Sequence, residues 1–228
     1  MNYEIMKQSE RELQVEFLKF YDHVYKTWQF IYKGVKNKNI NSSEVEEIYR
    51  MEDLSNHFEA KIQDDCIWSI SKNEPMANHL RYIIAILNSI KDLERMADYG
   101  VSAIRFFANN KITNDIRNLV IEILKGALNG MLKVFNSLKV KPAIDTYKIC
   151  QHAHVAFKNN YNKMVEKLSG ILKDHTAEQI ERLFHGAIII IKHIERLMDH
   201  VANIAENFVF IKQPDLFFSK HSKQIDKA

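Results

Sequence analysis

The 18 residues RYIIAILNSIKDLERMAD, at positions 81–98, occur a second time in altered form. Residues 182–199, RLFHGAIIIIKHIERLMD, match them at a spacing of 101 positions. Six of the 18 aligned pairs are identical: Arg81/Arg182, Ile90/Ile191, Lys91/Lys192, Glu94/Glu195, Arg95/Arg196 and Asp98/Asp199. Most of the other pairs join two apolar residues. A repeat of this length predicts a duplicated structural unit.

Apolar residues recur at helical spacing along almost the whole chain, and no segment alternates as a strand would. The breaks predict six helices, at about 3–34, 43–71, 75–108, 114–138, 143–171 and 176–211. We therefore expect an all-α protein made of two three-helix bundles in tandem, residues 1–110 and 111–212, followed by a C-terminal tail, residues 213–228.

Local signals mark some of the helix ends. Ser43 with Glu46, and Thr176 with Gln179, have the spacing of a capping box. Pro75 suits the first turn of the third helix and disfavours helix in the residue before it.

The composition narrows the class of protein. The chain has 228 residues, 46% of them hydrophobic, and only 6 Gly and 3 Pro, which favours long helices around a sizeable core. Gly126 and Gly130 would let a neighbouring helix pack closely. The net charge of +3 comes from intermixed acids and bases, a pattern that does not indicate a nucleic-acid binder.

The sequence also predicts a cytoplasmic location. The two cysteines, Cys66 and Cys150, are too few and too isolated for a disulfide framework or a cysteine-rich zinc site. The N-terminal stretch MNYEIMKQSERELQ lacks the features of a signal peptide. The apolar run GAIIII, at 186–191, is far too short to span a bilayer.

The acidic pairs of the repeat require an explanation. Glu94 and Asp98, like Glu195 and Asp199, lie one helical turn apart among apolar neighbours, where two like charges repel. One interpretation is ordinary ion pairs with basic residues such as Lys91. The other is a metal site, since clustered carboxylates suit iron, manganese, magnesium or, with less preference, zinc. Recurrence at matched positions favours the metal.

A second helix would have to supply further ligands. In the first unit, the candidates Glu52, Asn56 and Glu59 share one stripe of the second helix. The chain contains no Glu-x-x-His, no His-Glu-x-x-His, no phosphate-cradling glycine loop and no nucleophile elbow. These observations indicate a binding protein and not an enzyme. Among the histidines, His200 is singled out because it adjoins Asp199, an acid of the repeat.

Residues 73–106, NEPMANHLRYIIAILNSIKDLERMADYGVSAIRF, resemble the signature of the PhoU family of phosphate-transport regulators. In that family a Pro precedes a Leu-Arg pair, here Pro75, Leu80 and Arg81, and the helix ends in a Glu-Arg-x-x-Asp motif. The stretch IERLMDHVANIAENF, residues 194–208, is similar to the second copy of the family motif. The two copies together make the resemblance fairly specific.

The resemblance implies a function as well as a fold. PhoU-like proteins are tandem three-helix bundles, often dimers, that bind multinuclear iron, zinc or other metal clusters on acidic helix faces. They restrain phosphate uptake and phosphate-starvation signalling by contacting the ATPase of a phosphate ABC transporter and a sensor histidine kinase. By this resemblance the metal ligands would be Glu94, Asp98, Glu52, Asn56, Glu59, Glu195 and Asp199.

The second unit departs from the family pattern. If Tyr161 marks the register, His154 and Lys158 stand where the family has carboxylates. A lysine there would neutralise Glu195 and Asp199 directly. We therefore expect a metal site in the first unit and not the second.

Two alternatives remain open at this point. The chain could be a structural helical dimer whose acids form only internal ion pairs, or a hydrolase that activates water on a carboxylate-bound metal. Phe217 and Phe218 in the tail are candidate contact residues for a partner.

Overall fold

The structure is a computed structural model that describes residues 3–38, 40–110, 112–172 and 177–212. Side chains are described for these residues except 3, 171, 172, 177–186 and 212. The predicted capping box at Thr176 and Gln179, and the tail with Phe217 and Phe218, lie outside the described residues. Within the described part the chain is helical, without strands, so the all-α prediction is confirmed.

Six helices follow one another: α1 Tyr3–Asn37, α2 Ser42–Asn73, α3 Asn78–Asn109, α4 Asn114–Val140, α5 Ala143–Leu172 and α6 Ala177–Lys212. The predicted bounds agree to within a few residues. The start of α3 lies three residues after Pro75, the residue predicted to stand in its first turn. Glu74 caps the end of α2 in the left-handed region, with φ 46°, and Ala77 before α3 has φ 51°. Pro75 therefore lies in the turn between the two helices and not in the first turn of α3.

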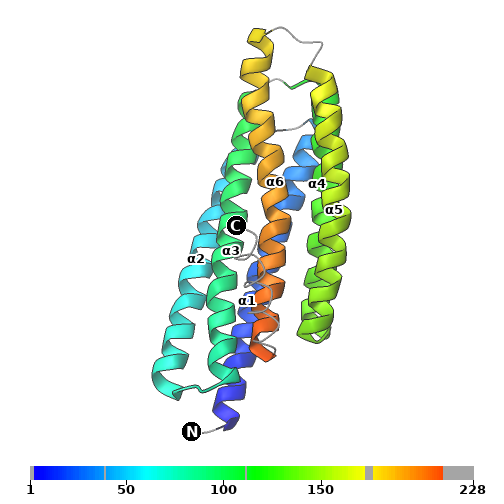
Figure 1. The fold of residues 1–228 in the computed structure, drawn as a ribbon. Coiled ribbons are helices and arrows are strands. Elements are labelled where there is room, and N and C mark those ends of the chain that lie inside the picture. The colour runs from blue at the N-terminus through cyan, green and yellow to red at the C-terminus, as the bar shows by residue number, and fades with distance from the viewer. Residues whose placement is uncertain (1–2, 39, 111, 173–176, 213–228) are drawn as a thin grey trace.

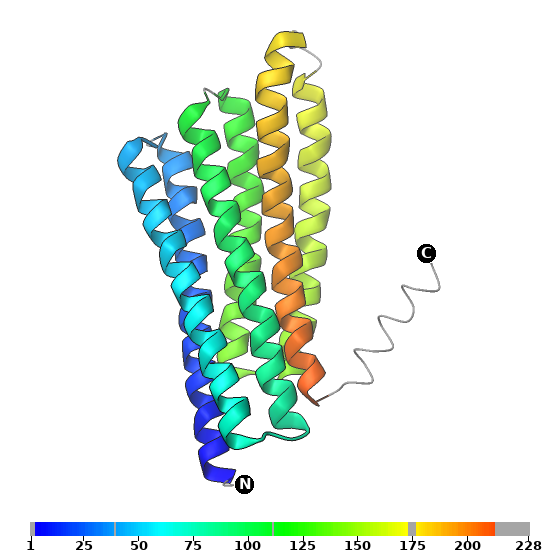
Figure 2. The same ribbon diagram turned by 90° about the vertical axis from the view of Figure 1, so that its left-hand side faces the viewer.

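The helices run along one common axis (Figure 1). Figure 2 shows two layers, with α2, α3 and α6 in one and α1, α4 and α5 in the other. Packing of α3 on α6 and of α1 on α4 joins the first three helices to the last three. The helices α2 and α5 pack within their own triplets, at opposite sides of the molecule.

The three-plus-three order of the helices matches the predicted tandem repeat. Whether 1–110 and 111–212 fold as independent units stays a prediction. Among the described helices, none has both the length and the apolar character needed to cross a membrane.

Large apolar side chains of α1 fill the space between the two layers. The indole of Trp28 is fully buried and donates to the carbonyl of Met96 on α3 at 2.8 Å. The hydroxyl of Tyr21 donates to the carbonyl of Met131 on α4 at 3.1 Å. Both polar tips are therefore satisfied while their rings add to the core. One helix thus anchors both triplets.

The expected close approach at glycine occurs at Gly130. A Cβ atom there would lie 2.6 Å from the terminal methyl group of Met198, so the glycine leaves room for this side chain, which would have to shift if position 130 carried a Cβ. At Gly126 an added Cβ would make ordinary contacts, the nearest of them at 3.6 Å. The expectation is therefore confirmed for Gly130 alone.

The N-terminus of α2 is capped two residues earlier than the sequence suggested. Asn41 Oδ1 accepts from the backbone N–H of Ser43 at 2.8 Å, and Glu44 accepts from the backbone N–H of Asn41 at 3.1 Å. The predicted box of Ser43 with Glu46 is wrong, because the helix already includes Ser43. Both pairs satisfy the spacing rule, and the extended backbone at Asn41 selects the earlier one.

A polar cluster joins α3 to α6 in the middle of the molecule. His200 Nδ1 lies 2.7 Å from Asp92 Oδ1, and both residues are buried. Asn203 donates to the same oxygen at 3.3 Å. A second contact between α3 and α6 is the stack of Tyr99 on His193, with ring centroids 4.6 Å apart. The repeat spacing of 101 aligns Asp92 with His193 and Tyr99 with His200, so the two contacts occupy equivalent places across the junction.

Candidate metal site and its counterpart in the second repeat

The two acidic pairs face the neighbouring helix of their own triplet. Glu94 and Asp98 lie on α3, which packs on α2, and Glu195 and Asp199 lie on α6, which packs on α5. The candidate residues of the first repeat are thus brought to one pair of helices. Their role as metal ligands stays a prediction, as it does for Glu195 and Asp199.

The first pair is a concentration of negative charge. Glu94 is half-buried and Asp98 is exposed. Burial raises the pKa of Glu94 to about 7, with help from the charge of Asp98, a hydrogen bond to Asp98 and the charge of Glu59 on α2. The nearby guanidinium of Arg95 opposes this rise only weakly. Glu94 therefore faces carboxylates from both helices.

The basic residues near the first pair do not neutralise it, as far as the structure describes them. Within the described part of the chain, neither Glu94 nor Asp98 forms an ion pair with a basic side chain, and Lys91, one turn before Glu94, does not reach it. Among the described residues, the interpretation as ordinary ion pairs therefore has no contact to support it at the first pair. A site with this charge fits a hard cation with oxygen ligands.

The remaining candidates on α2 are held differently. The amide of Asn56 donates to Glu52 Oε1 at 2.7 Å, one turn earlier on the same helix, so these two side chains partner each other. No group of three or more carboxylate, histidine or cysteine side chains is arranged to hold a metal ion among the described residues. The acids thus have the charge for a metal, but Glu52 is engaged elsewhere.

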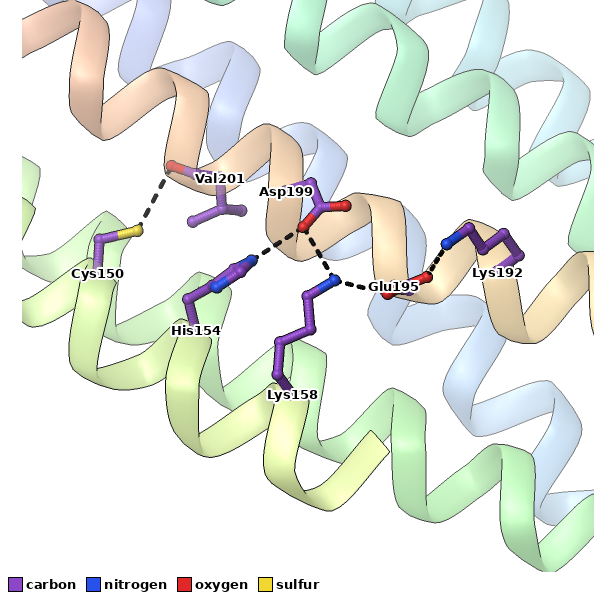
Figure 3. A network of polar contacts seen from close by, with 7 residues as sticks. All are labelled: Cys150, His154, Lys158, Lys192, Glu195, Asp199 and Val201. Atoms are coloured by element: carbon purple, nitrogen blue, oxygen red, sulfur yellow. Dashed lines mark hydrogen bonds and ion pairs between the residues drawn. The ribbon is translucent and has the colours of Figure 1, made fainter. Parts of the chain in front are cut away.

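The second pair has its cations built in (Figure 3). Lys158 Nζ on α5 lies 2.6 Å from Glu195 Oε1 and 3.4 Å from Asp199 Oδ1, so one ammonium group bridges both carboxylates. His154 Nε2 lies 2.9 Å from the same oxygen of Asp199. Lys192 pairs with the other oxygen of Glu195. The prediction that Lys158 neutralises this pair directly is confirmed.

These contacts determine the directions in which the pKa values of Glu195 and Lys158 shift. Glu195 is buried, which by itself would raise its pKa, but the hydrogen bonds from Lys158 and Lys192 outweigh burial and lower the pKa below its ordinary value. Burial would likewise lower the pKa of Lys158, and the two carboxylates raise it instead. The charged forms of Glu195 and Lys158 are both favoured, the reverse of the situation at Glu94.

The register assumed from Tyr161 agrees with the geometry. Burial, followed by the charge of Glu195 and a hydrogen bond to it, raises the pKa of Tyr161 to about 12. In the first repeat the charge of Glu59 on α2 raises the pKa of Glu94. At the spacing of 102 that aligns Tyr161 with Glu59, the buried residues Ile48, Ser55 and Ile62 of α2 align with the buried Cys150, Phe157 and Met164 of α5. This register aligns His154 with Glu52 and Lys158 with Asn56, so the lysine replaces an amide and not the expected carboxylate.

One part of the polar architecture was missed by sequence reasoning. His200 was singled out because of its neighbour Asp199, yet its partner is Asp92 on α3. The repeat alignment could have given a signal, since it sets Asp92 against His193 and Tyr99 against His200. The alignment shows that these positions are equivalent in the two repeats. It does not show that Asp92 contacts His200, or that Tyr99 contacts His193, where α3 packs on α6.

The comparisons with known proteins agree with this architecture. Residues 18–106 match the family model described as "PhoU domain". The Mycoplasma genitalium protein named "Uncharacterized protein MG409" is 34% identical over 95% of this chain and 98% of its own length. The Streptococcus pneumoniae "Phosphate-specific transport system accessory protein PhoU homolog" is 25% identical over 90% of this chain and 94% of its own.

A solved structure shows the same fold. The crystal structure of PhoU from Pseudomonas aeruginosa superimposes with a TM-score of 0.80 at 19% identity, covering 91% of this chain and 99% of that one. Fold, repeat and motif agree along almost the whole chain. The protein belongs to the PhoU family.

Proposed function

We propose that this chain is an accessory regulator of phosphate transport. Support comes from the family membership and from similarity, over nine-tenths of the chain, to the pneumococcal protein named as such an accessory protein. The chain would act in the cytoplasm as a negative regulator, contacting the ATPase of a phosphate ABC transporter and, where one exists, a sensor histidine kinase. It would work by binding, as a homodimer, and would catalyse no reaction.

We further propose that the first acidic pair binds a metal ion, iron or zinc. The observation that carries this proposal is the uncompensated charge at Glu94, whose pKa rises to about 7 beside Asp98 and Glu59. A divalent cation would remove the repulsion and favour the ionised form of Glu94. Glu94, Asp98 and Glu59 would supply oxygen ligands, and Glu52 would join them on leaving Asn56.

The metal proposal is tested by elemental analysis of the full chain purified without a metal-binding tag. The double variant Glu94→Ala/Asp98→Ala is expected to lose the iron or zinc found in the parent protein. A matched control removes the same number of charges from the exposed surface of α2, Asp53→Ala/Asp64→Ala, and should retain it. Equal metal content in all three proteins would contradict the proposal.

The regulatory role has an independent test. The full chain, used as bait in lysate from cells grown with high and with limiting phosphate, should capture the ATPase subunit of the phosphate transporter. Deleting the gene should raise phosphate uptake when phosphate is abundant. Failure of capture in both conditions, together with unchanged uptake, would contradict the role whatever the metal content.

One alternative keeps support from a specific observation. The ion pairs around Glu195 and Asp199 are those expected of a structural helical protein. If the first pair were also only structural, chelation would leave stability and assembly unchanged. No comparable observation favours a hydrolase.

A further inference from the structure

The second acidic pair carries its own cation in place of a metal ion. Lys158 Nζ lies between Glu195 Oε1 and Asp199 Oδ1, at 2.6 and 3.4 Å, where it contacts both carboxylates at once. Figure 3 shows the lysine reaching across from α5 to the two acids on α6. We infer that Lys158 occupies the second acidic site and excludes a divalent cation from it, so that the protein has one metal-competent repeat and one self-neutralised repeat.

The local charges support this inference. Glu195 and Asp199 bring two negative charges, and Lys158 and Lys192 bring two positive charges. The site is therefore neutral without a metal. At the first pair Asn56 stands in place of Lys158, and the α2 carboxylates add negative charge instead of removing it.

Displacing the lysine would be unfavourable for two reasons. The side chain of Glu195 is only 10% exposed, so its charge depends on a close partner. An ammonium group tethered to α5 is also present at a high effective concentration, which a dissolved cation must overcome. A divalent ion would have to release Lys158 into a half-buried position without a counter-charge.

The residues around Lys158 also support the inference. His154 Nε2 already contacts Asp199 Oδ1, and Tyr161 faces Glu195, in the positions that Glu52 and Glu59 hold in the first repeat. The three changes together replace two carboxylates and an amide by a lysine, an imidazole and a phenol. Lys158 is thus the selectivity residue, and His154 and Tyr161 complete a site that no longer needs a metal.

The test rebuilds the first pattern in the second repeat. In a Glu94→Ala/Asp98→Ala background, which removes the first pair, the full chain is titrated with Mn²⁺ before and after adding His154→Glu/Lys158→Asn/Tyr161→Glu. The background protein should bind no Mn²⁺ beyond that bound after further Glu195→Gln/Asp199→Asn substitution. The rebuilt protein should bind it at least about tenfold more tightly. Mn²⁺ binding by the background protein that disappears with Glu195→Gln/Asp199→Asn would overturn the inference.

A reciprocal variant covers the case in which the rebuilt protein does not fold. Asn56→Lys places a lysine opposite Glu94 and Asp98 in the otherwise native chain, with Asn56→Gln as the matched control. At pH 8 and without metal, the lysine variant should melt at a higher temperature than the control. An unchanged or lower melting temperature would contradict the view that a lysine at this position neutralises the pair.

The inference rests on the proposed metal-binding role only for its contrast between repeats. If the native chain bound no metal at the first pair, the metal proposal would fail. The rebuilt second repeat and the Asn56→Lys melting temperature would still give their own results. The two failures are therefore distinguishable.

Discussion

The acidic pairs of the two repeats occupy equivalent positions but have opposite electrostatic character. Glu94 is pushed toward its protonated form by burial and by neighbouring acids, and its pKa rises to about 7. Glu195 is more deeply buried, yet the hydrogen bonds from Lys158 and Lys192 outweigh that burial and lower its pKa. Duplication has preserved the backbone arrangement while the charge balance has diverged.

Part of the difference originates on the partner helices, and part on α6 itself, where Lys192 pairs with Glu195. The Glu-Arg-x-x-Asp motif is the same in α3 and α6, whereas α2 presents Asn56 where α5 presents Lys158. A motif shared by two repeats therefore does not establish a shared role. Its neighbours determine whether the acids need an external cation.

The largest effect is expected at Lys158. Lys158→Met leaves the buried Glu195 without its bridging partner, and should lower the free energy of unfolding by about 2–3 kcal/mol. Urea denaturation at pH 7 measures this. The matched variant Asn56→Met removes only an exposed hydrogen bond and should cost less than about 0.5 kcal/mol. Equal costs for the two variants would remove the distinction between the repeats.

A second comparison concerns the junction of α3 and α6. Asp92→Ala removes the partner of His200 and of Asn203 in a buried place, and should cost about 2 kcal/mol. Tyr99→Phe loses only contacts of 3.5 Å at its hydroxyl and keeps its stack on His193, so we expect about 0.5 kcal/mol or less. Thermal unfolding of both variants gives the order, and a larger loss for Tyr99→Phe would refute this account of the junction.

The pH dependence of stability should differ between the repeats. Because the pKa of Glu94 is raised in the folded state, the native state binds more protons between about pH 4.5 and 7, and the metal-free protein loses stability as the pH rises through this range. The loss should be about 1 kcal/mol, given the partial exposure of Glu94, and Glu94→Gln should abolish it. Denaturation curves at several pH values test this. A Glu94→Gln variant with an unchanged pH profile would count against the assignment.

Glu195 should act in the opposite direction. Its lowered pKa in the folded state provides stability that is present above its ordinary pKa and is lost as the pH falls toward and below that value. Lys158→Met should weaken this acid-side dependence, in the same set of denaturation curves.

The smallest effect is expected at His154. Its partner Asp199 has a side chain that is 45% exposed, so the contact is screened by water. His154→Gln should change the unfolding free energy by about 0.5 kcal/mol or less. Chemical denaturation can compare it with Lys158→Met. A cost as large as that of Lys158→Met would mean that the lysine is not the main neutralising group.

Much of the fold could be predicted from sequence, because long amphipathic helices have a clear periodicity and the repeat fixes their order. The ion pairs of Lys158 could also be predicted, since the sequence places a lysine on the stripe of α5 that faces the acidic pair of α6. Which side chains of one helix pair with each other could not be predicted. Lys91 and Lys192 each precede their glutamate by three residues in the sequence. Only Lys192 forms an ion pair within the described part of the chain.

Contacts between helices of different repeats also could not be predicted from the sequence. Periodicity shows which face of α3 is buried, but not that Asp92 on this face meets His200 on α6. The start of α2 illustrates the same limit on a smaller scale. Two residue pairs fit a capping box there, and only the backbone conformation at Asn41 distinguishes them.

The most direct test of the central claim is the metal content of two matched variants of the full chain, measured by elemental analysis. We predict that Glu94→Gln/Asp98→Asn loses about one equivalent or more of bound iron or zinc relative to the native chain. Glu195→Gln/Asp199→Asn should keep the native content, because Lys158 already serves that pair. An equal loss of metal from both variants would contradict the claim that the two repeats differ.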